Sequence, residues 1–100
     1  MESEKKYDFI NNEEISIVNF YVNWCFYCKI QKLILNKFNK IFGDKAKIYN
    51  INSDENQNLV NKLDVHSFPS ILIFKNGNMV TRLTGLQNNN ALTETVAKYL

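Results

Sequence analysis

Residues 15–22 are apolar apart from Ser16 and Asn19. A segment that is apolar on both sides is typical of a strand covered by helices on both faces, as in a parallel sheet. Residues 46–52 are predicted to form a second strand, and the segment that joins the two strands is long enough for a crossover. The pattern therefore predicts two parallel strands joined by a helix.

A helix is predicted to begin at Cys25 and to end at Gly43-Asp44. Its residues divide into an apolar and a polar set at helical spacing, which predicts one buried and one solvated side. The residues expected on the buried side are Ile30, Leu33, Ile34, Phe38, Ile41 and Phe42. Those expected on the solvated side are Lys29, Lys32, Asn36, Asn39 and Lys40.

The second half of the chain predicts a short helix, a hairpin and a last helix. Ser53 or Asp54 can cap the short helix, whose apolar residues are Leu59, Val60 and Leu63. The strands 70–74 and 79–84 flank Asn76-Gly77, a pair typical of a tight antiparallel hairpin. Asn88–Asn90 can cap the last helix, whose apolar stripe is Leu92, Val96, Tyr99 and Leu100.

The predicted order of elements is βαβαββα, preceded by a candidate amphipathic helix over residues 4–12 that carries Tyr7, Phe9 and Ile10. This order favours an α/β fold with helices on both faces of a mixed sheet, central parallel strands and a hairpin at one edge. A chain of 100 residues, 45% of them hydrophobic, can bury one core but not two. We therefore expect a single domain over residues 1–100.

Charge and hydropathy exclude two classes of function. The net charge is +2, from 12 basic and 10 acidic residues, which is too small for a protein that binds the nucleic-acid backbone. The longest apolar run, Trp24–Cys28, is far shorter than the ~20 residues of a membrane helix. Residues 1–6 carry no apolar leader, so a cytoplasmic monomer is expected.

The strongest candidate for chemistry is the Cys25-Phe26-Tyr27-Cys28 segment, where the buried strand meets the long helix. Cys25 is expected at or near the N-cap, where unpaired N–H groups and the helix dipole favour a thiolate. The thiolate is the nucleophile of thiol chemistry. Cys28 lies one turn later, within reach to resolve a mixed disulfide formed by Cys25.

Two other interpretations of the cysteine pair stay open. A Cys-x-x-Cys segment is also half of a zinc site, or two inert cysteines. Cys25, Cys28 and His66 are the only soft or imidazole donors in the chain, whereas a closed zinc site needs four ligands. A closed metal site would therefore need two chains. Pro69, the only proline, indicates by itself no more than the start of a strand.

Four segments in this order resemble the thioredoxin family. They are Trp24-Cys25-Phe26-Tyr27-Cys28-Lys29 after a buried strand, Phe68-Pro69-Ser70, the turn Phe74-Lys75-Asn76-Gly77, and Gly85. The fold implied by this resemblance has a central mixed sheet of three parallel strands plus an antiparallel hairpin, with helices on both faces.

The resemblance also implies a site. Cys25 would be the nucleophile, Cys28 the buried resolving thiol and Pro69 a cis proline. The backbone around Phe68 would pair with an extended segment of a protein substrate. The apolar groove around Cys25 would consist of Trp24, Phe68, Pro69, Gly85 and Leu86. No bound cofactor is implied beyond the Cys25–Cys28 disulfide, and the partner implied for re-reduction is an NADPH-dependent thioredoxin reductase.

The chain departs from the family at a buried charge pair. Asn19 stands where the family usually has an aspartate, and Ile48 aligns with the lysine near that aspartate. An amide cannot take the proton from Cys28, so water or Cys25 would have to serve. One hypothesis is a slower or more oxidising relative of ordinary thioredoxin; the alternative is that Asn19 is only a hydrogen-bonded buried amide.

Other positions are expected to modulate the site. Phe26-Tyr27 replaces the usual Gly-Pro between the cysteines, and that dipeptide tunes the reduction potential. His66 could stabilise the thiolate or contact substrate, or be a solvated loop histidine. Lys29 belongs to a polar stripe with Lys32 and Lys40, either a solvated face or a docking surface for an acidic partner.

The sequence is thus interpreted as a thiol–disulfide oxidoreductase that reduces protein disulfides. An oxidase or isomerase of the protein disulfide isomerase type, a binding module with incidental redox activity, and a two-subunit metal site stay open as alternatives.

Overall fold

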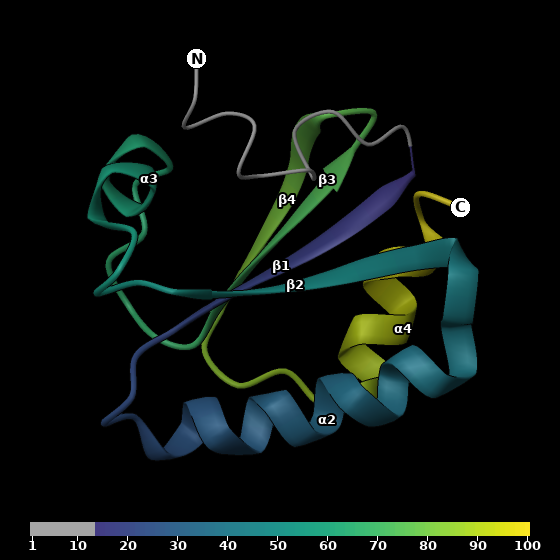
Figure 1. Ribbon diagram of the computed structural model, residues 1–100. Coiled ribbons are helices and arrows are strands. Elements are labelled where there is room, and N and C mark those ends of the chain that lie inside the picture. The colour runs from purple at the N-terminus through teal and green to yellow at the C-terminus, as the bar shows by residue number, and fades with distance from the viewer. Residues whose placement is uncertain (1–13) are drawn as a thin grey trace.

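The computed structural model describes residues 14–100, which fold around a four-stranded sheet in the order β2-β1-β3-β4 (Figure 1). The strands are β1 (Ile15–Tyr21), β2 (Ala46–Asn52), β3 (Ser70–Lys75) and β4 (Asn78–Thr84). The helices are α2 (Phe26–Phe42), α3 (Gln57–Lys62) and α4 (Asn89–Ala97), and a 3-10 turn, η2 (Gly43–Lys45), follows α2. The helix expected over residues 4–12 lies outside the described residues.

The sheet separates two apolar layers. One lies between the sheet and helices α2 and α4, and its largest buried residues are Ile17, Leu35, Phe38, Ile71, Ile73 and Leu92. The other lies on the face covered by α3, and its buried residues are Val18, Phe20, Leu59, Val65, Leu72 and Phe74. Figure 1 shows the same arrangement, with α2 and α4 on one side of the strands and α3 on the other. Strand β1 contributes to both layers, as its two-sided apolar pattern predicts.

Of the three parallel strands that the resemblance implies, two lie within residues 14–100. Strands β1 and β2 are parallel, but β3 runs antiparallel to both β1 and β4. Helix α3 has six residues and spans only about 9 Å, whereas seven-residue β2 spans about 23 Å. The helical part of the connection therefore does not return the chain along the whole sheet, and β3 starts at the edge where β2 ends.

Helix α2 begins and ends where the sequence predicts. Cys25 is its N-cap, and Gly43 ends it with a positive φ of 56°, a conformation that favours glycine. The N–H of Gly43 donates to the carbonyl oxygen of Asn39. The strand–helix junction at the cysteines is thus built as expected.

The buried side of α2 differs from the prediction. Its buried residues are Cys28, Gln31, Leu35 and Phe38, which recur at three- and four-residue spacing. Leu33 and Ile41, which were expected to be buried, are 64% and 71% exposed. Leu33 lies two residues from Leu35, about 200° around the helix. Apolar residues occur on two sides of α2, and only one side faces the sheet.

The cap of α3 is also not the predicted one. Asn56 precedes the helix, while Ser53 and Asp54 belong to the turn before it. The side-chain Oδ1 of Asn52 accepts the backbone N–H groups of Asp54 at 3.0 Å and of Glu55 at 3.3 Å. This Asx-type turn takes up the residues that would otherwise begin the helix.

The hairpin and the last helix follow the prediction with one exception. Asn76 and Gly77 have φ values of 55° and 80°, as a two-residue hairpin turn requires. Asn88 caps α4 by accepting the N–H of Ala91 at 2.8 Å. Leu92 and Val96 are buried, but Leu100 lies beyond the end of the helix and is exposed.

The assignment of the buried side of α2 can be tested with two leucines of the same helix. Leu35 is 1% exposed, and Leu35→Ala is expected to lower the free energy of unfolding by about 2–5 kcal/mol because it leaves a cavity. Leu33→Ala removes the same atoms from an exposed site and should change it by less than about 0.5 kcal/mol. Urea unfolding of both variants measures the difference. Equal losses would contradict the packing described above.

Candidate active site

The two cysteines lie at the start of α2 and are joined as a disulfide, with their Cα atoms 5.2 Å apart. The Sγ of Cys25 accepts the backbone N–H of Cys28 at 3.1 Å. That N–H is one of the donors that a helix leaves unpaired in its first turn. Cys25 is 9% exposed and Cys28 is 3% exposed. Cys25 is therefore the sulfur nearer to solvent and the one that the helix terminus faces.

A second segment, just before β3, borders the disulfide. The Phe68–Pro69 peptide bond is cis, as the resemblance implies. The carbonyl oxygen of Phe68 lies 3.8 Å from the Sγ of Cys25, close enough to accept a weak hydrogen bond when that sulfur carries a proton. The carbonyl oxygen of Pro69 accepts the N–H of Gly85 at 2.9 Å. Three separate parts of the chain thus meet around Cys25.

Large apolar side chains are exposed in these parts of the chain. Trp24 is 77% exposed, Phe26 and Tyr27 are both well exposed, and Leu86 is 41% exposed. The rings of Phe26 and Tyr27 contact each other edge to face, with centroids 5.7 Å apart. Exposed apolar groups that gather around a reactive group are typical of a binding surface.

The comparisons with known proteins decide what this arrangement is. Residues 2–98 match the sequence profile of the family named Thioredoxin. The chain belongs to the thioredoxin family. It is 36% identical over 89 residues to the thioredoxin of Bacillus subtilis (strain 168), an overlap of 89% of this chain and 86% of that protein. It is 32% identical over 98 residues to the thioredoxin of Rickettsia conorii, covering 98% of this chain and 93% of that protein.

Solved structures agree with the sequence relatives. The fold is similar to that of a mutant thioredoxin from Halobacterium salinarum NRC-1, with a TM-score of 0.86 and 25% identity, over 96% of this chain and 83% of that chain. It is also similar to thioredoxin-2 of the malaria parasite, with a TM-score of 0.82 and 27% identity, over 85% of this chain and 82% of that chain. The predicted thioredoxin fold is confirmed.

Family membership also confirms the predicted activity. The chain is a thioredoxin-type thiol–disulfide oxidoreductase that reduces protein disulfides, and Cys25–Cys28 is its redox-active pair. Within residues 14–100 no group of three or more histidine, cysteine, aspartate or glutamate residues could hold a metal ion. In the part of the chain that the structure describes, no helix has the length and hydropathy to cross a membrane.

An amide pair joins β1 to β2 in the thioredoxin fold, with Asn19 buried and Asn50 exposed. Asn19 of β1 is fully buried, and its Nδ2 donates to the Oδ1 of Asn50 on β2 at 3.1 Å. The register pairs Asn19 with Asn50 and Ile17 with Ile48. Asn50 therefore lies directly opposite Asn19, and Ile48 lies two residues earlier on the same face of β2.

The amide pair is neutral and incompletely hydrogen-bonded. Among residues 14–100, the Oδ1 of Asn19 has no hydrogen-bond partner. Among the described residues, the side-chain hydrogen bond of Asn19 therefore goes to a neutral amide and not to a carboxylate or an ammonium group. Reducing chemistry at Cys28 has to proceed without a carboxylate at position 19.

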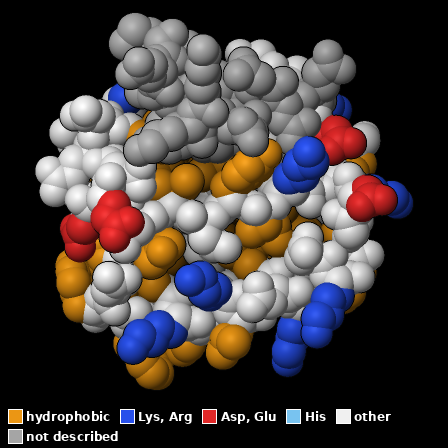
Figure 2. Space-filling model, in the orientation of Figure 1, with side chains coloured by type: hydrophobic (Ala, Val, Ile, Leu, Met, Phe, Trp, Pro, Cys, Tyr) orange, Lys and Arg blue, Asp and Glu red, His pale blue; other side chains and the backbone are white. Residues whose placement is uncertain are grey.

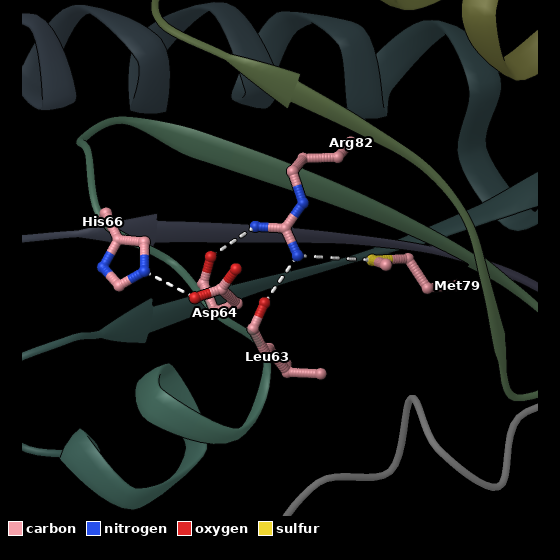
Figure 3. Close-up of polar contacts among 5 residues, drawn as sticks. All are labelled: Leu63, Asp64, His66, Met79 and Arg82. Carbon is pink, nitrogen blue, oxygen red and sulfur yellow. Dashed lines mark hydrogen bonds and ion pairs between the residues drawn. The ribbon is translucent and has the colours of Figure 1, made fainter.

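His66 pairs with Asp64 in the segment between α3 and β3 (Figure 3). Its Nε2 pairs with the Oδ1 of Asp64, and both side chains are largely exposed. Arg82 of β4 donates to the carbonyl oxygens of Leu63 and Asp64, which links the end of α3 to the hairpin. Among the described residues, neither a hydrogen bond nor an ion pair joins His66 to either cysteine. The structure thus brings His66 to Asp64 rather than to Cys25.

The lysines expected on the outer side of α2 are exposed. Lys29, Lys32 and Lys40 all face away from the sheet, and the Nζ of Lys32 lies 4.7 Å above the ring of Tyr21. Figure 2 shows lysine and apolar side chains next to each other along the edge formed by α2. The polar stripe is confirmed, and its role as a docking surface stays a prediction.

Gln31 links α2 to the loop before α4, and the apolar pattern of the sequence does not predict this role. It is fully buried between Cys28 and Leu35 on the sheet side of α2, and its side-chain amide bonds the backbone of Gln87. The signal available in the sequence was a polar residue at a core position of the helical stripe. Such a residue is expected to have a specific hydrogen-bond partner.

The neutral amide pair makes a testable difference to stability. Asn19→Asp places a carboxyl at a fully buried position that faces Asn50, and burial without a cation raises the pKa of that carboxyl. Above the ordinary carboxyl range the folded state then binds more protons than the unfolded state, so stability falls as pH rises. We expect Asn19→Asp to be near wild type at low pH and about 3 kcal/mol less stable at pH 7.

Urea unfolding between pH 4.5 and 8 measures this dependence. The double variant Asn19→Asp/Asn50→Lys supplies the missing cation and should recover most of the loss. A single variant that is as stable as wild type at pH 7 would show that the position is not the dry neutral site described above.

Proposed function

We propose that Cys25 is the nucleophile and Cys28 the resolving thiol of this disulfide reduction. The observation that carries the assignment is the N–H of Cys28 that donates to the Sγ of Cys25 in the first turn of α2. A donor at this position, together with the positive end of the helix dipole, stabilises a negative sulfur. The greater exposure of Cys25 supports the same order of roles.

In the proposed reaction the reduced protein begins with a Cys25 thiolate. This thiolate attacks one sulfur of the substrate disulfide, forms a Cys25–substrate disulfide and expels the other substrate sulfur as a thiolate, which takes up a proton. Cys28 then releases its proton to solvent water, and the Cys28 thiolate attacks the Sγ of Cys25. The Cys25–Cys28 disulfide forms, the second substrate sulfur leaves, and two electrons have passed to the substrate.

We propose that protein substrates bind in a groove made by Trp24, Phe68, Pro69, Gly85 and Leu86. Trp24 and Leu86 are exposed, and Phe68 is partly exposed beside the disulfide. The backbone N–H of Phe68 has no hydrogen-bond partner within residues 14–100, and its carbonyl oxygen contacts only the Sγ of Cys25 there. Unpaired backbone groups of an extended segment can bind a substrate strand.

The proposed partners are proteins with disulfides and, for re-reduction, an NADPH-dependent thioredoxin reductase. Both are supported by membership of the thioredoxin family. A cytoplasmic location, a monomeric state and a single domain over residues 1–100 stay predictions. Two relatives are named as chloroplast proteins, from pea and spinach, so the family works in more than one compartment.

We also propose that Asn19 makes the resolving step depend on water or on Cys25. No carboxylate stands at position 19 to take the proton of Cys28, and Asn50 beside it is equally neutral. Phe26, Tyr27, Lys29 and His66 are proposed to modulate the potential or substrate contacts. Phe26 and Tyr27 are supported by their exposure next to the cysteines.

The two cysteine roles predict different behaviour when each cysteine is replaced by serine. Cys25→Ser should reduce catalysis of insulin reduction by dithiothreitol to the uncatalysed rate, because no nucleophile is left at the surface. Cys28→Ser should still attack substrate but should not resolve, so a mixed disulfide with the substrate accumulates. Non-reducing electrophoresis and mass spectrometry detect that complex.

The Cys25→Ser/Cys28→Ser double variant is the matched control and should form no complex. Complexes that form with Cys25→Ser and not with Cys28→Ser would reverse the proposed roles. Unchanged insulin reduction by Cys25→Ser would show that Cys25 is not the nucleophile.

A further inference from the structure

The buried amide of Gln31 joins two parts of the chain that are far apart in sequence. Gln31 lies on α2 one turn after Cys28 and is fully buried. Its Nε2 donates to the carbonyl oxygen of Gln87 at 3.0 Å, and its Oε1 accepts the N–H of Gln87 at 2.7 Å. One side chain thus satisfies both backbone groups of one residue. Two bonds from a planar amide fix the position and the orientation of that backbone.

The residue held in this way belongs to the loop between β4 and α4. The side chain of Gln87 donates to the carbonyl oxygens of Thr84 and Gly85, both at 3.2 Å. The N–H of Gly85 in turn donates to the carbonyl oxygen of Pro69 at 2.9 Å. A continuous series of hydrogen bonds therefore runs from the helix that carries the cysteines to the cis proline. Leu86 stands in the sequence between Gly85 and Gln87, two residues of this series.

Packing alone does not explain a glutamine at this position. The neighbours of Gln31 on the buried side of α2 are Cys28 and Leu35, and an apolar side chain of the same length would fill the space without burying a polar group. Such a side chain would leave the N–H and the carbonyl oxygen of Gln87 without their partners. The amide is thus suited to holding the loop rather than to filling the core.

We propose that Gln31 is a positioning residue that holds the 84–87 loop, and with it Leu86, against α2 in the conformation that receives an extended protein substrate. The inference rests on the groove proposed above. It assigns to Gln31 an effect on substrates that reach Leu86, which are polypeptides that extend along the groove. A small disulfide that reacts at Cys25 alone does not need a contact with the 84–87 loop.

The variant Gln31→Met keeps the length of the side chain and its helix propensity, and it removes both hydrogen bonds. Because the loop then spends less time in the binding conformation, we expect the KM for insulin to rise about fivefold to tenfold. The kcat for insulin, and the rate with the small disulfide 5,5′-dithiobis(2-nitrobenzoate), should change by less than about twofold.

A structural readout accompanies the kinetics. Amide hydrogen exchange of Gln87 should be at least about tenfold faster in Gln31→Met than in wild type. In wild type, Gln87 should exchange more slowly than Leu86, whose N–H has no hydrogen-bond partner among the described residues. That comparison needs no variant. A Gln87 amide in wild type that exchanges as fast as the Leu86 amide overturns the proposal.

Asn88→Ala is the matched control for stability. It removes the side-chain cap of α4 at the next residue of the chain, which is expected to lower stability, and leaves the bonds of Gln31 in place. Its KM for insulin should stay within about twofold of wild type. An equal rise in KM for Asn88→Ala and Gln31→Met would assign the effect to stability and overturn the positioning role.

The outcomes separate this inference from the proposed groove. Wild-type protein that reacts with the small disulfide but not with insulin would overturn the groove and the inference with it. Wild-type protein that reduces insulin, with Gln31→Met unchanged in KM, would overturn only the role of Gln31. Should Gln31→Met fail to fold, Gln31→Glu keeps the length and the acceptor but loses the donor at neutral pH. It should raise the KM for insulin in the same way, and an unchanged KM overturns the role.

Discussion

The chemistry of this protein depends on the point where a buried strand becomes a helix. Strand β1 is covered on both faces, so its end has a fixed position in the core. The chain then turns into α2 with Cys25 as the N-cap, and the unpaired N–H groups of the first turn meet a sulfur. For a cysteine placed one turn further into the helix, the N–H groups of the next turn already donate to helix carbonyl oxygens, so its sulfur gains no such contact. The reactivity of one thiol is thus set by where the strand stops.

Backbone hydrogen bonds from distant segments complete the site around that junction. The loop before β3 reaches Cys25 through Phe68, and the loop after β4 reaches Pro69 through Gly85. Few of these contacts depend on charge. Even the fully buried position 19 carries an amide, bonded to the exposed amide of Asn50, instead of an ion. The site is therefore organised by hydrogen bonds of neutral groups, which avoid the cost of burying ions.

Local periodicity was enough to predict the order of the elements, the start of α2 and the turn at Asn76-Gly77, because each depends on neighbouring residues. Contacts between distant elements were not predictable in the same way. Leu33 and Leu35 are chemically alike, and only the direction of the sheet decides which is buried. The pairing of Asn19 with Asn50 depends on strand register, which a single sequence does not contain. The motif therefore identified the cysteines, while the residues that support them required the fold.

Arg82 is the only arginine among twelve basic residues, and the eleven others are lysines. Its guanidinium reaches two successive carbonyl oxygens at the end of α3, those of Leu63 and Asp64. A lysine ammonium is a compact charge that cannot present two donors in one rigid plane. All other basic residues of the chain are lysines, and the single guanidinium occurs where one planar group donates to two neighbouring carbonyl oxygens. An Arg-to-Lys exchange, conservative by charge, would at this one place release the loop that carries the cis proline.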